Sequence, residues 1–146
     1  MKNDYCYRGY LKIDPETKKT HFIQNPNSPQ LYEVKDLPGV CFIEYKQDGD
    51  IYYVIIDKDC VSKAVGHTWC SNGNGYLIGG GKFLHRVIMN ENRAQYHVHH
   101  RGAKFDNRVK KLQSVHYKQH SNKRAYRDIL TIDKSNISQI AKIFQY

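Results

Sequence analysis

The sequence has no apolar run of bilayer length, and its first residues lack the apolar core of a signal peptide. A membrane-spanning helix needs about 20 mostly apolar residues. A secretory leader needs a shorter apolar stretch behind a basic start. We therefore expect a soluble, cytoplasmic protein with no membrane partner.

Cysteine is scarce and scattered. The chain has four cysteines, Cys6, Cys41, Cys60 and Cys70, with no CxxC pair among them. This spacing is typical of free thiols, some of them buried. A structural zinc held by some of these thiols is the alternative, although structural zinc ligands usually come in close pairs.

Phosphate-loop and repeat signatures are also missing. The glycine triplet at residues 79–81 is not followed by the Gly-Lys-Ser/Thr of a phosphate-binding loop, so it predicts a flexible turn. We expect no organic cofactor. No internal repeat or low-complexity tract is present.

Acidic residues are outnumbered by basic ones. The chain has 14 Asp and Glu against 23 Lys and Arg, which gives a net charge of +9 over 146 residues. Such an excess is typical of proteins that bind nucleic acid or an anionic surface. The length allows one core of ordinary size, with or without a small appendage.

The first half of the chain is predicted to be mainly β. Residues 9–13 and 19–23 predict one hairpin around Asp14-Pro15-Glu16-Thr17, since Asp followed by Pro favours a turn. Residues 40–46 and 51–57 predict a second hairpin and are rich in Tyr, Ile, Val and Phe. The chain's 12 tyrosines have two uses to weigh: base stacking on single strands, or packing within these strands, which is the commoner use.

The middle of the chain predicts short elements. Residues 60–67 predict a short helix or turn, and residues 69–78 a hairpin in which Trp69 anchors the core. Residues 83–90 predict a helix with an apolar face, which leaves Arg86 free to reach phosphate.

The most informative stretch is residues 98–124, VHHRGAKFDNRVKKLQSVHYKQHSNKR. Residues 95–100 predict a strand that sends His99 and His100 to opposite faces. A loop at 102–111 and a strand at 112–115 follow. Residues 116–124 predict an exposed helix with His116 and His120 on one face.

Five short motifs follow one another in and before this stretch: Trp69, the glycine-containing turn at 72–76, Leu84-His85-Arg86-Val87-Ile88-Met89, Val98-His99-His100 and Phe105-Asp106-Asn107-Arg108. In this order they resemble the HNH homing endonucleases of phages and introns. The resemblance covers residues 57–124 and implies a ββα-metal nuclease core.

The resemblance also implies residue roles. His100 matches the family's general base, and His99 matches the preceding metal ligand. His120 matches the second ligand, with His116 as the alternative. The family's middle asparagine falls on Lys111, where this chain departs from the pattern, and Asn107 is the candidate substitute.

The chemistry needs these residue types independently. Cleavage of a phosphodiester requires a base that is neutral near pH 7, which is the range of histidine. One divalent ion would offset charge on the phosphate. Imidazole ligands favour Mn²⁺ or another transition metal, while phosphate oxygens also admit Mg²⁺.

The implied partner is double-stranded DNA. Basic and polar side chains would contact its backbone and supply a salt-dependent affinity. The predicted contacts are Arg86, Arg101, Lys104, Asn107, Arg108, Lys110, Lys123 and Arg124.

After residue 124 the pattern changes. Residues 129–144 have apolar residues spaced as in an amphipathic helix, with Ser135 as its cap. The alternative is the first helix of a truncated helix-turn-helix module.

The sequence therefore predicts an α+β fold with a β-rich region at 1–56, an HNH nuclease core at 57–124 and a C-terminal amphipathic helix at 125–146. The predicted function is metal-dependent DNA hydrolysis by a nicking or homing endonuclease. The alternative is a nuclease-derived DNA- or RNA-binding protein without catalysis, which the replacement at Lys111 favours.

Overall fold

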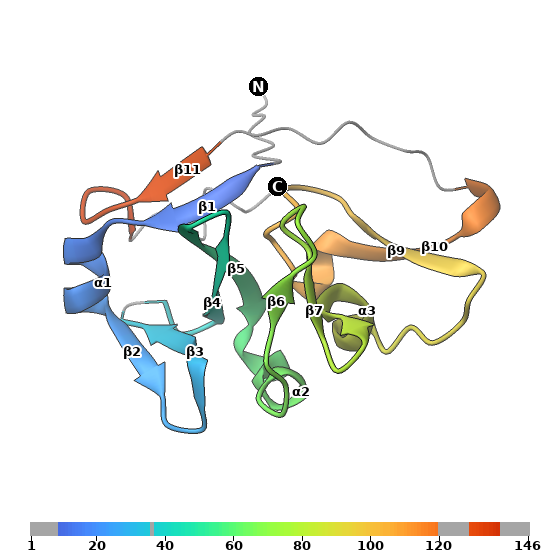
Figure 1. The fold of residues 1–146 in the computed structure, drawn as a ribbon, viewed down its shortest axis with the longest axis horizontal. Helices are drawn as coiled ribbons and strands as arrows, with labels where there is room; N and C mark the ends of the chain where they lie inside the picture. Colours follow the sequence, from blue (N-terminus) through green and yellow to red (C-terminus); the bar gives the residue numbers. More distant parts are fainter. Residues whose placement is uncertain (1–8, 36, 120–128, 138–146) are drawn as a thin grey trace.

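The computed structural model describes residues 9–35, 37–119 and 129–137, and shows a mixed α+β fold rich in strands (Figure 1). The strands are β1 Tyr10–Ile13, β2 Phe22–Asn25, β3 Ser28–Val34, β4 Val40–Gln47, β5 Asp50–Asp57, β6 Cys70–Ser71, β7 Leu77–Gly79, β8 Lys82–Phe83, β9 Tyr96–His100, β10 Leu112–His116 and β11 Ile129–Ile132. The helices are α1 Pro15–His21, α2 Val61–Ala64 and α3 Leu84–Met89, with 3-10 turns η1 Lys58–Cys60, η2 Val109–Lys111 and η3 Tyr117–Gln119. None of the helices in these ranges has the length and apolar character needed to cross a membrane.

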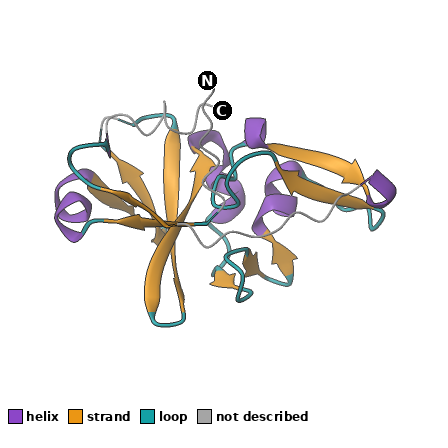
Figure 2. Cartoon of the chain, turned by 90° about the horizontal axis from the view of Figure 1, so that it is seen from above, coloured by secondary structure: helices purple, strands orange, loops and turns teal. Residues whose placement is uncertain are grey.

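A six-stranded sheet forms the larger part of the fold, in the order β11-β1-β5-β4-β3-β2. β1 and β11 are parallel, and the other neighbours are antiparallel. β6, β7 and β8 form a small second sheet, and β9 and β10 form a separate hairpin. Figure 2 shows this hairpin extending away from the large sheet.

The hairpin of β4 and β5 confirms the second predicted hairpin. Eight residue pairs join the two strands from Val40↔Asp57 to Gln47↔Asp50. The two turn residues, Asp48 and Gly49, have φ of 54° and 85°. Positive φ at both central residues is the geometry that matches the twist of the flanking strands, and Asp-Gly adopts it readily.

The first predicted hairpin is wrong, because residues 15–21 form α1. Asp14 accepts a hydrogen bond at Oδ2 from the backbone N of Thr17, at 3.2 Å. Pro15 occupies the first helical turn, where its missing N–H costs no hydrogen bond. The Asp-Pro pair therefore caps a helix here instead of closing a turn.

The predicted C-terminal helix is wrong at its start. Residues 129–132 form β11, paired with β1 from Tyr10↔Ile129 to Ile13↔Ile132. Pairing with the edge of a sheet outweighs the helical spacing of the apolar residues. Residues 134–136 form a turn, and the rest of that prediction, at 125–128 and 138–146, lies outside the described residues.

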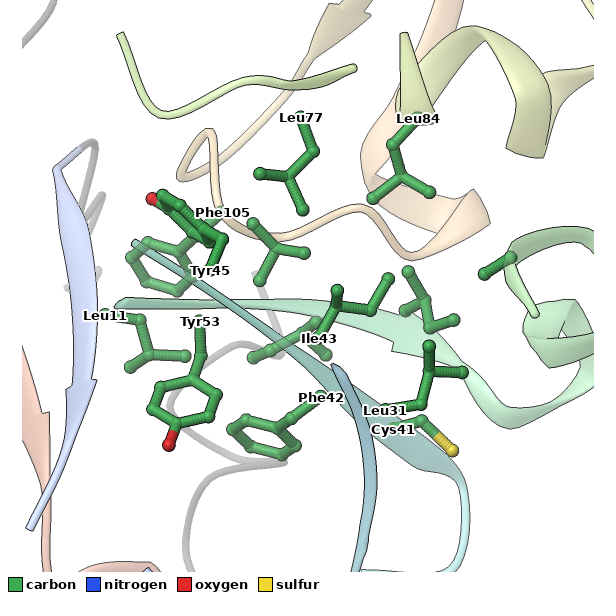
Figure 3. Close-up of a cluster of buried hydrophobic side chains, with 14 of the residues drawn as sticks. Leu11, Leu31, Cys41, Phe42, Ile43, Tyr45, Tyr53, Leu77, Leu84 and Phe105 are labelled. Carbon is green, nitrogen blue, oxygen red and sulfur yellow. The ribbon is translucent and has the colours of Figure 1, made fainter. Parts of the chain in front are cut away.

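One hydrophobic core joins the parts of the chain. Its members include Leu11 of β1, Phe42 of β4, Leu77 of β7 and Phe105 of the loop after β9, and Figure 3 shows several of them together. Ile132, from β11, belongs to the same core. Buried residues from the predicted β-rich region at 1–56, the predicted core at 57–124 and the C-terminal segment at 125–146 thus pack in one cluster.

Other expectations hold within this core. Trp69 is 2% exposed, and its ring nitrogen donates to the carbonyl of Ala64 at 3.0 Å. Tyr45 and Tyr53 are buried, as packing in strands predicts. The described cysteines Cys41, Cys60 and Cys70 are free thiols, the first two buried.

Candidate functional site

The hairpin of β9 and β10 positions the two neighbouring histidines. The register pairs His100 with Leu112 and His99 with Gln113. Because successive residues of a strand point to opposite faces, His99 and His100 lie on opposite faces, as predicted. His100 shares its face with Val98, which is buried in the core.

The loop from β9 to β10 is docked on β5. The N–H of Ile55 donates to the carbonyl of Phe105, and the N–H of Asn107 donates to the carbonyl of Ile55, both at 2.8 Å. Asp106 thereby forms a parallel bridge to Ile55. The loop thus lies beside β5 as a neighbouring strand would. This pairing fixes the position of Asp106 and Asn107.

A buried ion pair stabilises the same loop. Arg108 donates from Nε to Oδ1 of Asp106 at 2.8 Å and from Nη2 to Oδ2 at 2.6 Å. The two side chains are 5% and 2% exposed. A bidentate pair of this geometry orients both groups as well as offsetting their charges.

Asn107 holds His100 in one orientation. Its Oδ1 lies 2.9 Å from Nε2 of His100. Because a carbonyl oxygen only accepts, Nε2 carries the proton and donates, and the lone pair is left on Nδ1. The neutral ring is therefore oriented with its basic nitrogen away from Asn107.

Two further rings pack against His100. The ring centroids of His85 and His100 are 5.1 Å apart, with 62° between the planes. Tyr76 lies 5.6 Å from each of them. Three separate segments thus bring Tyr76, His85 and His100 together as one cluster.

Sequence reasoning did not identify Tyr76 or His85 as site residues. Both lie in motifs that carry the family resemblance, the turn at 72–76 and the segment at 84–89. Their location in these two motifs was the only feature of the sequence that could have indicated a role in the site. The contact itself depends on how α3 packs beside β9.

Both histidines of the cluster are held neutral. Desolvation lowers the pKa of His100 to about 4, against an opposing effect of the Asn107 hydrogen bond. The pKa of His85 falls to about 3, mainly through desolvation and then through the nearby charge of protonated His100. His100 therefore stays unprotonated well below the pH of about 6 expected for an ordinary histidine.

A stability measurement can check these pKa shifts. In the unfolded chain both histidines return to values near 6.5, so below that pH the unfolded state binds protons that the folded state does not. The free energy of unfolding should therefore fall as the pH drops from about 6.5 towards 4. Urea unfolding at stepped pH measures this, and His85→Gln should show a weaker dependence. Equal stability at pH 7 and pH 4.5 would contradict the shifts.

Of the two predicted metal ligands, the structure describes only His99. His99 is half-buried at the end of β9, and imidazole suits a transition metal. His120 lies outside the described residues. Within the described ranges, no three His, Cys, Asp or Glu side chains form a group that could hold a metal ion.

The alternative ligand His116 does not fit the predicted site. It belongs to β10, not to a helix, and pairs with Tyr96. By strand alternation it lies on the face of His100, opposite to His99. It is also four residue steps from the level of His100, about 13 Å along the strands.

Three of the predicted DNA contacts are buried, so that assignment is wrong for them. Lys104, Asn107 and Arg108 are 7%, 3% and 4% exposed. Lys104 donates to the carbonyl of Asn74, and its Nζ lies 4.4 Å from the ring centroid of Tyr10. Each of the three side chains has an internal partner and supports the loop instead of meeting DNA.

Arg86 is also engaged within the protein. It donates from Nη1 to the carbonyl of Tyr96 at 2.6 Å and from Nη2 to the carbonyl of Arg93 at 2.9 Å. It therefore ties α3 to the segment before β9, against the prediction that it is free for phosphate. Arg101 and Lys110 lie at the two ends of the loop that connects β9 to β10, and both are exposed, as a DNA contact requires. Lys123 and Arg124 lie outside the described residues.

Lys111, at the position of the family's middle asparagine, is 6% exposed. Its backbone N–H donates to the carbonyl of Arg108, and its carbonyl accepts from Arg101, both at 2.8 Å. The amide that contacts His100 comes from Asn107.

Comparisons of the chain with family models, curated proteins and solved structures give no match.

Proposed function

We propose that this protein is a metal-dependent DNA endonuclease of the HNH type, with His100 as its general base. The observation that supports it best is the environment of His100. A neutral imidazole is oriented through Nε2 by Asn107 and packed against His85 and Tyr76. Preorganised groups of this kind are what proton transfer in a transition state requires.

In this proposal Nδ1 of His100 accepts a proton from water, and the resulting hydroxide attacks the phosphorus of a phosphodiester. Proton transfer changes the ring from neutral to cationic, and the Oδ1 of Asn107 accepts a hydrogen bond from Nε2 in both states. A divalent ion held by His99 and His120 would supply Lewis-acid stabilisation of the phosphate and of the leaving 3′ oxygen. The products would be 5′-phosphate and 3′-hydroxyl ends, and a single site of this kind would nick one strand.

The exposed basic side chains Arg101 and Lys110 flank the loop that carries Asn107. Contacts between such cations and phosphate release counterions and give an affinity that falls with salt. Double-stranded DNA is therefore the proposed substrate, and the net charge of +9 favours it.

Incubation with supercoiled plasmid tests the proposal. We expect nicked circles with Mg²⁺, Mn²⁺ or another transition metal, none with EDTA, and recovery when metal is restored. The buried Lys111 favours a second candidate, a nuclease-derived DNA- or RNA-binding protein. Intact plasmid with every metal at low salt, together with salt-dependent and EDTA-insensitive binding, would establish that candidate instead.

A further inference from the structure

Four side chains, Arg93, Tyr96, His116 and Tyr117, pack against one another in series at the end of the β9–β10 hairpin that lies opposite to the connecting loop. We call this series the stack. The guanidinium carbon of Arg93 lies 3.6 Å from the ring centroid of Tyr96. Tyr96 meets His116 edge to face at 5.3 Å and 85°, and His116 meets Tyr117 at 4.8 Å with 31° between the planes. The four residues come from the segment before β9, from both strands and from η3. Figure 1 shows that this end of the hairpin of β9 and β10 points away from the large sheet.

The stack is fixed at both ends. Arg93 donates from Nε and from Nη2 to the two carboxylate oxygens of Glu91, each at 2.9 Å. Glu91 itself is only 6% exposed. At the other end, the N–H of Tyr117 donates to the carbonyl of Gln95 at 2.7 Å, which holds the backbone of η3 against the start of β9.

Among the residues that the structure describes, Tyr117 is the last ring of the series, and it is open to solvent. It is 51% exposed, whereas Tyr10, Tyr45, Tyr52 and Tyr53 are at most 8% exposed. An exposed aromatic ring backed by another ring, as Tyr117 is by His116, loses little conformational freedom when a flat ligand stacks on it. Lys118, the next residue, is exposed and cationic.

We propose that Tyr117 is a stacking platform for an unpaired nucleobase and that Lys118 contacts the phosphate beside it. Aromatic rings accept any base by stacking, and a neighbouring cation supplies attraction to the backbone. An apolar protein partner would suit an exposed tyrosine alone, but the excess of positive charge on this chain favours a polyanion.

The platform is also placed to serve the nuclease site, a point that rests on the proposed function. His116, the ring that Tyr117 packs against, lies on the same face of the hairpin as His100, about 13 Å away along the strands. At about 3.4 Å per nucleotide in a stacked strand, that separation spans about four nucleotides. The preferred substrate would then have an unpaired or extruded base near the cut, such as a junction between single and double strands.

Equilibrium binding in EDTA tests the platform without cleavage. The probes are a single-stranded oligodeoxynucleotide and an oligoribonucleotide of the same sequence, each containing the fluorescent base 2-aminopurine, and a blunt duplex. We expect Tyr117→Ala to weaken single-strand binding about 5- to 100-fold and to remove the quenching of 2-aminopurine. Tyr117→Phe should keep both, and duplex affinity should change little. Ile129→Ala, at a residue of matching 52% exposure on β11, is the control and should bind normally.

The outcomes separate this inference from the proposed function. Wild-type affinity in Tyr117→Ala, or no single-strand binding by the wild type, would overturn the platform even if plasmid is nicked. Loss of binding in Tyr117→Phe would also overturn it, because stacking does not need the hydroxyl. Tyr117-dependent binding with plasmid left intact would instead reject the nuclease and keep the platform. Thermal unfolding identifies a misfolded alanine variant, in which case Tyr117→Leu, which keeps apolar bulk without an aromatic face, replaces it and should show the same loss.

Discussion

The plasmid-nicking rate of the variant His100→Ala should be about 10²- to 10⁴-fold lower than that of the wild type, while the variant keeps most of its DNA affinity. The loss follows from the proposed role, because water would no longer have a positioned base. Affinity should persist because contacts between phosphate and exposed cations such as Arg101 and Lys110 dominate binding. Single-turnover nicking and a filter-binding measurement on the same preparation give the two quantities.

Two matched variants make the result specific. His97→Ala removes an exposed histidine from the same strand and should nick at nearly the normal rate. Asn107→Ala leaves the base but frees its ring, so we expect a smaller loss of up to about 100-fold, of the size that misplacement of a catalytic group produces. Normal turnover by His100→Ala would remove His100 from the mechanism.

The variant Asp106→Ala should lower the free energy of unfolding by about 3–5 kcal/mol. It leaves the guanidinium of Arg108, which is 5% exposed, without the carboxylate that offsets its charge. The same change removes the acceptor of the Arg108 backbone N–H. Urea unfolding measures the loss, and near-neutral stability in this variant would contradict the role of the ion pair.

Controls distinguish this buried pair from a surface pair. Glu33 and Lys58 lie 3.3 Å apart with side chains 49% and 51% exposed, so Glu33→Ala should change stability by at most about 1 kcal/mol. Replacing both partners of the buried pair, with Asp106→Leu and Arg108→Met, should cost less than Asp106→Ala alone, because neither buried charge remains. A double variant as unstable as the single one would show that geometry, not charge burial, sets the loss.

The ion pair and the candidate site are linked through one short segment. Asp106 and Asn107 are neighbours, and the loop that contains them is bonded on both sides to Ile55. Loss of the Asp106 carboxylate should therefore also loosen the hydrogen bond from His100 to Asn107. The nicking rate of Asp106→Ala should fall at temperatures where the variant is still folded.

The local elements were predictable from the sequence by itself. The β4–β5 hairpin follows from two runs rich in Tyr, Ile, Val and Phe around Asp48-Gly49, and β9, β10 and α3 follow from their own periodicities. The placement of His99 and His100 on opposite faces needs only strand geometry. These features depend on interactions between residues near one another in the chain, which composition and spacing record.

Only the tertiary structure decided how those elements meet. Residues 129–132 add a strand to the large sheet, because a partner far away in the chain outweighed the local pattern. Arg108 is buried because its loop docks at Ile55, more than fifty residues earlier in the sequence. The grouping of Tyr76, His85 and His100 likewise depends on the packing of three separate segments, and spacing along a chain contains no record of such distances.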